Sequence, residues 1–92
     1  MIRSWANSAT RRFAEDGKSQ FSGLDADRAI ELLATLDAAT SLGDLSPLAS
    51  VALHKLSRDR KGQWAMTVNG PWRICFRFDA GHAFDVEIVD YH

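Results

Sequence analysis

The chain has 92 residues, of which 46% are hydrophobic and 25% charged, with a formal net charge of −1 and a single cysteine. This length suits one compact domain over residues 1–92 and excludes two. No apolar run approaches the roughly 18 residues of a membrane span, and the first residues lack the apolar core of a signal peptide. One cysteine excludes an internal disulfide and a cysteine-based zinc site. We therefore expect a globular, cytoplasmic domain.

Charge is distributed unevenly along the chain. Residues 54–78 carry six basic side chains and one acidic side chain, whereas residues 13–53 carry seven acidic and two basic side chains. A local basic surface attracts phosphate even when the whole chain is nearly neutral. A solvated strand edge rich in lysine and arginine would give the same pattern, and charge alone favours this second interpretation.

The first part of the sequence predicts a short strand and two helices. The strand is expected at residues 2–5, and Asn7 or Ser8 can cap a first helix that ends at Gly17. A second helix is expected over residues 24–39, where apolar residues recur at helical spacing along one face. The residues of this face are Ala26, Ala29, Ile30, Leu33 and Leu36.

After residue 39 the pattern changes to loops and strands. Residues 40–52 contain glycine and proline and are expected to form a loop with a short helical turn. A short strand is expected at residues 53–56, and beyond it the apolar period becomes two, which predicts three longer strands. Their alternating apolar residues are Trp64, Met66 and Val68, then Trp72, Ile74, Phe76 and Phe78, then Phe84, Val86 and Ile88.

Matching the apolar faces of neighbouring strands gives an expected register. Three-residue loops at 69–71 and 80–82 would pair Val68 with Trp72 and Phe78 with Phe84, whereas two-residue loops would pair apolar with polar positions and are rejected. One face of the sheet is then apolar, and the two helices can cover it. The prediction is an α+β fold in which a small twisted, mainly antiparallel sheet has two N-terminal helices packed on one face.

The opposite face of this sheet is expected to be polar. It would carry Thr67, Arg73, Cys75, Arg77, Asp85, Glu87, Val89 and Tyr91, with Arg77 opposite Asp85 and Arg73 opposite Val89. A sheet face that bears arginines and an aromatic residue, and that no helix covers, is a candidate RNA surface.

The terminal tripeptide Asp90-Tyr91-His92 is the strongest local signal for chemistry. Such tripeptides usually fray without a function, but here the strand before it is apolar and should anchor it. The terminal carboxylate beside the His92 imidazole favours its protonated form. A protonated histidine suits a general acid or a phosphate-binding cation near neutral pH.

His54 and Arg73 are the other candidates. His54 is followed by several basic residues, although a strand histidine more commonly has only a structural hydrogen bond. The Arg73 guanidinium can hold a phosphate in two contacts, and its ordinary role would be a cross-strand ion pair. The three histidines, His54, His82 and His92, lack tight ligand spacing, so no metal site is expected.

These residue types suit RNA cleavage. A deprotonated 2′-hydroxyl can attack the adjacent phosphate, provided that a base, an acid for the leaving 5′-oxygen and a cation on the phosphate are present. The candidate residues contain enough groups for all three roles, and the residue types alone do not assign them.

Several stretches together resemble the HigB family of the RelE/ParE toxin superfamily. They are Leu53-His54-Lys55-Leu56, Lys61-Gly62-Gln63-Trp64, Asn69-Gly70-Pro71-Trp72-Arg73, Phe76-Arg77-Phe78 and the terminal Val89-Asp90-Tyr91-His92. The resemblance covers nearly the whole chain, and the Asn-Gly-x-Trp-Arg stretch combined with the terminal Asp-Tyr-His is specific. It implies a RelE-like fold and a toxin that cleaves messenger RNA on the ribosome without a metal or another cofactor.

The resemblance also implies roles for individual residues. His92 and His54 would be the acid and base candidates, Arg73 would bind the scissile phosphate, and Asp90 and Tyr91 would position the RNA or a histidine. RNA contacts are expected from Lys55, Arg58, Lys61 and Arg77. The family commonly has Pro-Leu-Lys-Gly after the histidine, where this chain has Lys55-Leu56-Ser57-Arg58. Ser57 therefore replaces an expected lysine, which concerns cleavage efficiency more than the fold.

The resemblance implies partners as well. They are a HigA-like helix-turn-helix antitoxin, the ribosome and messenger RNA, with operator DNA bound only through the antitoxin and no membrane. Two alternatives stay open. One is a degenerate toxin that acts as a co-repressor with its antitoxin, which Ser57 favours; the other is a ParE-like toxin that binds a protein target and is not a nuclease.

Overall fold

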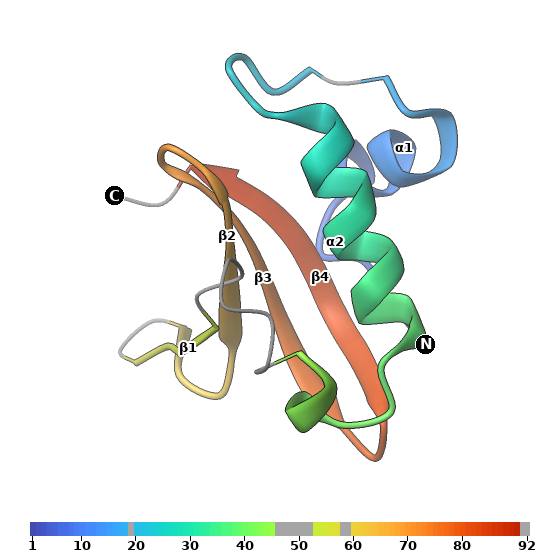
Figure 1. The fold of residues 1–92 in the computed structure, drawn as a ribbon, viewed down its shortest axis with the longest axis vertical. Helices are drawn as coiled ribbons and strands as arrows, with labels where there is room; N and C mark the ends of the chain where they lie inside the picture. The colour runs from blue at the N-terminus through green and yellow to red at the C-terminus, as the bar shows by residue number, and fades with distance from the viewer. Residues whose placement is uncertain (19, 46–52, 58–59, 91–92) are drawn as a thin grey trace.

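The computed structural model describes residues 1–18, 20–45, 53–57 and 60–90. Within these ranges the elements follow the order α1, α2, η1, β1, β2, β3, β4, where η1 is a short 3-10 helix (Figure 1). The four strands form one antiparallel sheet in sequential order, and both α-helices lie on the same side of it. The predicted α+β fold is therefore confirmed. No helix in the described ranges is long and apolar enough to cross a membrane.

Helix α1 (Ser8–Asp16) has the ends that the sequence predicted. The Asn7 side chain caps it by accepting a hydrogen bond from the Thr10 amide at 2.9 Å. At its other end Gly17 adopts a left-handed conformation (φ 70°) and its amide donates to the Phe13 carbonyl at 2.8 Å. Both ends are fixed by local hydrogen bonding, which is why the sequence alone located them.

Helix α2 (Ala26–Ala38) begins two residues later than predicted. The Asp25 side chain accepts from the Arg28 amide at 3.2 Å and so acts as the N-cap. The predicted buried face was also wrong at one position, because Ile30 is 42% exposed whereas Leu32 is buried. The buried residues Ala29, Leu32, Leu33 and Leu36 follow the spacing of one helical face. Helix α2 has two overlapping apolar faces, one with Leu32 and one with Ile30, and packing against the sheet buries the face with Leu32.

The loop after α2 contains the expected helical turn, η1 (Leu42–Asp44). Asp44 accepts hydrogen bonds from the amides of Thr40 and Ser41, at 2.8 and 3.2 Å, which hold the pKa of its carboxyl below the usual value. The sheet consists of β1 (His54–Lys55), β2 (Trp64–Asn69), β3 (Trp72–Asp79) and β4 (His82–Asp90). Strand β1 is shorter than predicted.

The register between β2 and β3 is correct at its centre and wrong at the turn. Trp64 pairs with Phe76 and Met66 with Ile74, as expected. Asn69, however, pairs with Trp72 across a two-residue turn, and an irregularity between Thr67 and Asn69 takes up Val68. The rejected two-residue loop is thus compatible with a buried Val68 because the extra residue forms a bulge.

A two-residue turn followed by a register irregularity also connects β3 and β4. The turn residues Ala80 and Gly81 both have positive φ, 50° and 82°, as the favoured two-residue hairpin turn requires. Phe84 therefore pairs with Arg77, not with Phe78 as predicted. A second irregularity, at which Asp85 has a φ of 53°, restores the expected pairing of Ile74 with Ile88. As a result Phe84 shares the face of Arg77, and the predicted apolar face lacks it.

The N-terminal segment covers the free edge of β4. Residues 2–5, predicted as a strand, form two isolated parallel bridges, Ile2 with Ala83 and Trp5 with Val86. The Thr10 hydroxyl of α1 continues this edge by accepting from the Ile88 amide at 3.0 Å. Covering an edge strand in this way satisfies its backbone groups and prevents pairing with other chains. The core between sheet and helices includes Phe13, Leu36, Met66, Ile74, Phe76 and Val86.

Candidate functional site

We define the outer face as the side of the sheet that faces away from the two helices. Antiparallel pairing places His54, Ala65, Cys75 and Glu87 in one row across the four strands. The adjacent row contains Thr67, Arg73 and Val89. A small apolar cluster, separate from the core, forms the floor of this face: Leu56, Ala65, Cys75 and Val89. The structure thus brings His54 and Arg73 to one surface.

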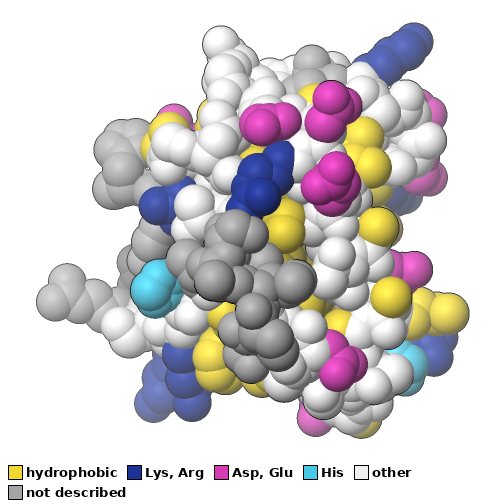
Figure 2. All heavy atoms as spheres, viewed as in Figure 1, with side chains coloured by type: hydrophobic (Ala, Val, Ile, Leu, Met, Phe, Trp, Pro, Cys, Tyr) yellow, Lys and Arg dark blue, Asp and Glu magenta, His cyan; other side chains and the backbone are white. Residues whose placement is uncertain are grey.

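His54 is exposed and lies at the β1 end of its row. Figure 2, which views the molecule from the same side as Figure 1, shows acidic side chains grouped near α2, and a histidine with basic side chains toward β1. An exposed imidazole on a strand is accessible to a ligand and can exchange a proton with it. His82, by contrast, is half-buried, and its Nε2 lies 3.5 Å from Nη2 of Arg3.

The Arg73 guanidinium is held at the turn between β2 and β3. Its Nη1 donates to the carbonyl oxygens of Gly70, at 2.7 Å, and of Trp72, at 3.0 Å. The side chain is half-buried, and Arg73 pairs with Val89 as predicted. Hydrogen bonds from one nitrogen to neutral carbonyls fix the guanidinium without neutralising its charge. Arg73 therefore presents a positioned cation at the outer face.

The terminal tripeptide is only partly described. Asp90 is the last residue of β4, is exposed and pairs with Trp72. Strand alternation places it on the helix side of the sheet, whereas Val89 belongs to the outer face. Tyr91 and His92, together with Arg58, lie outside the described residues.

The structure places the predicted RNA-binding residues on both faces. Arg77 is on the outer face. The predicted pairing of Arg77 with Asp85 was wrong, because the two-residue turn pairs Arg77 with Phe84, but Nε of Arg77 still lies 3.4 Å from Oδ2 of Asp85. Lys61 is exposed in the turn between β1 and β2. Lys55 lies on the helix side, with Nζ 5.9 Å from the centre of the Trp64 ring, and this separates it from His54.

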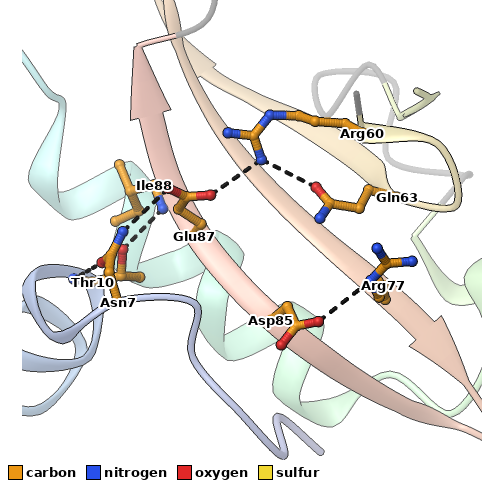
Figure 3. Close-up of polar contacts among 8 residues, drawn as sticks. All are labelled: Asn7, Thr10, Arg60, Gln63, Arg77, Asp85, Glu87 and Ile88. Carbon is orange, nitrogen blue, oxygen red and sulfur yellow. Dashed lines mark hydrogen bonds and ion pairs between the residues drawn. The ribbon is translucent and has the colours of Figure 1, made fainter. Parts of the chain in front are cut away.

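Sequence reasoning missed one feature of the outer face, the contact between Arg60 and Glu87. Nη1 of Arg60 donates to Oε1 of Glu87 and to Oε1 of Gln63, both at 3.1 Å (Figure 3). Glu87 is 27 residues from Arg60, and no local pattern links two oppositely charged residues at that separation. The pairing of β3 with β4 was the only available signal, because it places Glu87 on the same face as Cys75.

Cys75 is fully buried in the floor of the outer face. Burial raises the pKa of its thiol, and the nearby Arg60 and Arg73 guanidinium groups counter this only in part. Cys75 is therefore a neutral packing residue and not a nucleophile. In the part of the chain that the structure describes, no three His, Cys, Asp or Glu side chains gather as metal ligands would.

Comparison with known proteins agrees with this fold. Residues 3–92 match the family model described as the RelE-like toxin of the type II toxin-antitoxin system HigB. The chain is also 37% identical, over 93 aligned positions that cover all of both chains, to the protein named endoribonuclease HigB from Proteus vulgaris. A type II system pairs a protein toxin with a protein antitoxin, so the family implies an antitoxin partner. The chain belongs to the HigB family of RelE-like toxins of type II toxin-antitoxin systems.

Proposed function

We propose that this toxin is an endoribonuclease that cleaves messenger RNA on the ribosome and so inhibits translation. The observation that carries the proposal is the outer face, which places His54 and Arg73 together with one apolar floor on the side of the sheet opposite both α1 and α2. The name of the Proteus vulgaris relative, an endoribonuclease, supports the same activity. We further propose a HigA-like helix-turn-helix antitoxin as the partner, through which alone the toxin would reach operator DNA.

The proposed reaction uses the RNA's own 2′-hydroxyl. A base removes its proton, the 2′-oxygen attacks the adjacent phosphorus, and the bond from phosphorus to the 5′-oxygen breaks as an acid protonates that oxygen. The products are a 2′,3′-cyclic phosphate and a free 5′-hydroxyl. Arg73 would stabilise the negative charge that develops on the phosphate. Of His54 and His92, one would serve as the base and the other as the acid, and the chemistry is compatible with either assignment.

The remaining candidates have supporting roles in this proposal. Asp90, which lies on the helix side of the sheet, would position a histidine, and Tyr91 would position the RNA or a histidine. Lys61, Arg58 and Arg77 would contact the phosphate backbone. We do not include Lys55, because it lies on the opposite side of the sheet over Trp64.

The proposal is tested by expressing the toxin inducibly in bacteria and mapping messenger RNA 5′ ends. The test variant is Arg73→Ala combined with His92→Ala, and the matched control is Arg11→Ala, since Arg11 is an exposed arginine of α1. Thermal unfolding of each purified variant establishes that it is folded. We expect new cuts in translated regions for the wild type and the control and none for the test variant.

The two alternatives give different results in the same experiment. Growth arrest without new cuts would indicate a ParE-like toxin that acts by binding a protein. Neither arrest nor cuts would indicate a degenerate toxin that serves as a co-repressor, the alternative that Ser57 favours.

A further inference from the structure

Arg60 is held more firmly than Arg77, another arginine of the outer face. One nitrogen, Nη1, donates to two side-chain acceptors, Glu87 and Gln63. The Arg60 and Glu87 side chains are 28% and 24% exposed, whereas those of Arg77 and Asp85 are 49% and 50% exposed. Exposed ion pairs hold their geometry weakly because water and salt screen them. The more shielded pair fixes the orientation of the Arg60 guanidinium.

Glu87 is itself fixed from a second direction. Its other carboxylate oxygen, Oε2, accepts from Nδ2 of Asn7 at 3.2 Å, while Oδ1 of Asn7 caps α1 (Figure 3). A hydrogen-bonded chain thus runs from the end of a helix through β4 to the loop that carries Arg60. Hydrogen bonds on both oxygens restrict rotation of the Glu87 carboxylate, so it supports the Arg60 guanidinium in one orientation.

A second edge of the Arg60 guanidinium, formed by Nε and Nη2, points away from its two acceptors. Among the described residues the structure records acceptors for Nη1 alone, and Figure 3 shows Nε and Nη2 on the side away from Glu87 and Gln63. The Nε–Nη2 edge of an arginine can hold a phosphate in two parallel hydrogen bonds. Arg60 contacts Glu87, which pairs with Cys75, whereas Val89, two residues farther along β4, pairs with Arg73. Arg60 and Arg73 are therefore linked to adjacent rows of the outer face.

We infer that Arg60 contacts a second, non-scissile phosphate of the RNA, next to the one that Arg73 binds, and that Glu87 is the positioning residue that aims it. This inference rests on the proposed nuclease function. The competing explanation is that Arg60 only ties the loop between β1 and β2 to β4, in which case it would affect stability but not RNA.

The test compares four variants with the wild type: Arg60→Gln, Arg60→Lys, Glu87→Gln and the control Arg11→Gln. Two quantities are measured on ribosomes programmed with messenger RNA: kcat and KM of cleavage, and the affinity for a messenger RNA whose 2′-O-methyl riboses prevent cleavage. The affinity of the toxin for these ribosomes is measured at several salt concentrations. Each measurement is made once with a messenger RNA codon in the ribosomal A site and once with the A site empty. Thermal unfolding gives the folded fraction of each variant, and each kinetic constant and affinity is corrected for that fraction.

We expect Arg60→Gln to raise KM about ten- to a hundredfold, the range for losing a charge-assisted hydrogen bond, with a smaller change in kcat. The slope of log affinity against log salt should fall by about one, because one phosphate contact is lost. Arg60→Lys should restore the slope but only part of the affinity, since lysine cannot make two parallel contacts. Glu87→Gln should raise KM without lowering the slope, and Arg11→Gln should change neither.

Each contrary result has a distinct meaning. A less stable Arg60→Gln variant with unchanged KM and salt slope would overturn the inference and leave the nuclease intact. An equal loss of affinity with the A site empty would assign the contact to ribosomal RNA and overturn the messenger RNA assignment. A wild-type protein that cuts no RNA would instead refute the proposed function itself.

Discussion

Replacing Thr10 with valine tests how the edge of β4 is covered. Thr10 is fully buried although it is polar, and its hydroxyl accepts from the buried Ile88 amide at 3.0 Å. Valine has nearly the same shape, so Thr10→Val preserves packing while leaving that amide without its partner. An unsatisfied buried donor costs about 1–3 kcal/mol.

The cost is measurable because a domain of this kind has a total stability of only about 5–15 kcal/mol. Since about 1.4 kcal/mol corresponds to a factor of ten, the unfolded population should rise about 5- to 140-fold. Urea unfolding followed by far-ultraviolet circular dichroism gives the free energy directly. With a slope of about 1–3 kcal/mol per molar urea, the midpoint should fall by about 1 M.

Thr10→Ser is the matched control. Serine keeps the hydroxyl acceptor and loses one buried methyl group, which costs about 0.8 kcal/mol. Hydrogen exchange at the Ile88 amide supplies the local measurement: it should be faster in Thr10→Val and close to wild type in Thr10→Ser. A Thr10→Val protein at least as stable as Thr10→Ser, with the Ile88 amide still protected, would refute this account of the edge.

Three further predictions concern other parts of the molecule. Gly81→Ala should lower the urea midpoint more than Gly70→Ala does: both positions have positive φ, but only at Gly81 would a Cβ press on a backbone atom, the Thr40 carbonyl oxygen at 3.2 Å. Equal losses would contradict that steric argument. Because burial raises the folded-state pKa of the Cys75 thiol above the 9.0 of an unperturbed thiol, the stabilising effect of the buried neutral thiol is complete below pH 9.0 and is lost as pH rises through the folded-state pKa. Urea midpoints should therefore fall less steeply above pH 9 in Cys75→Ala than in the wild type, and identical slopes would show that the thiol does not contribute. Lys55→Gln should leave affinity for RNA unchanged in a fluorescence anisotropy titration, since its side chain lies on the helix side of the sheet; a clear loss of affinity would place RNA on that side as well.

The sequence determined the features that depend on neighbouring residues. The capping side chain of Asn7 and the left-handed Gly17 set the ends of α1 through hydrogen bonds that span only a few residues. The period of two in the second half predicted β2, β3 and β4, and the central pairs of Ile74 with Met66 and Ile88 followed from matching apolar faces. His54 and Arg73 were identified as candidates from their chemistry and from a family resemblance.

The tertiary structure decided what no local pattern encodes. Two-residue turns are favoured because their twist matches that of the strands, and the resulting offset is absorbed by one irregularity in each hairpin. The second irregularity moves Phe84 to the outer face, although its position in the alternation predicted the core. The pair of Arg60 and Glu87 likewise exists only because the folded sheet brings together residues 27 apart in the chain. Local hydrogen bonding and periodicity act within one element, whereas the energy of these features comes from contacts between elements, which form only when the whole sheet is assembled.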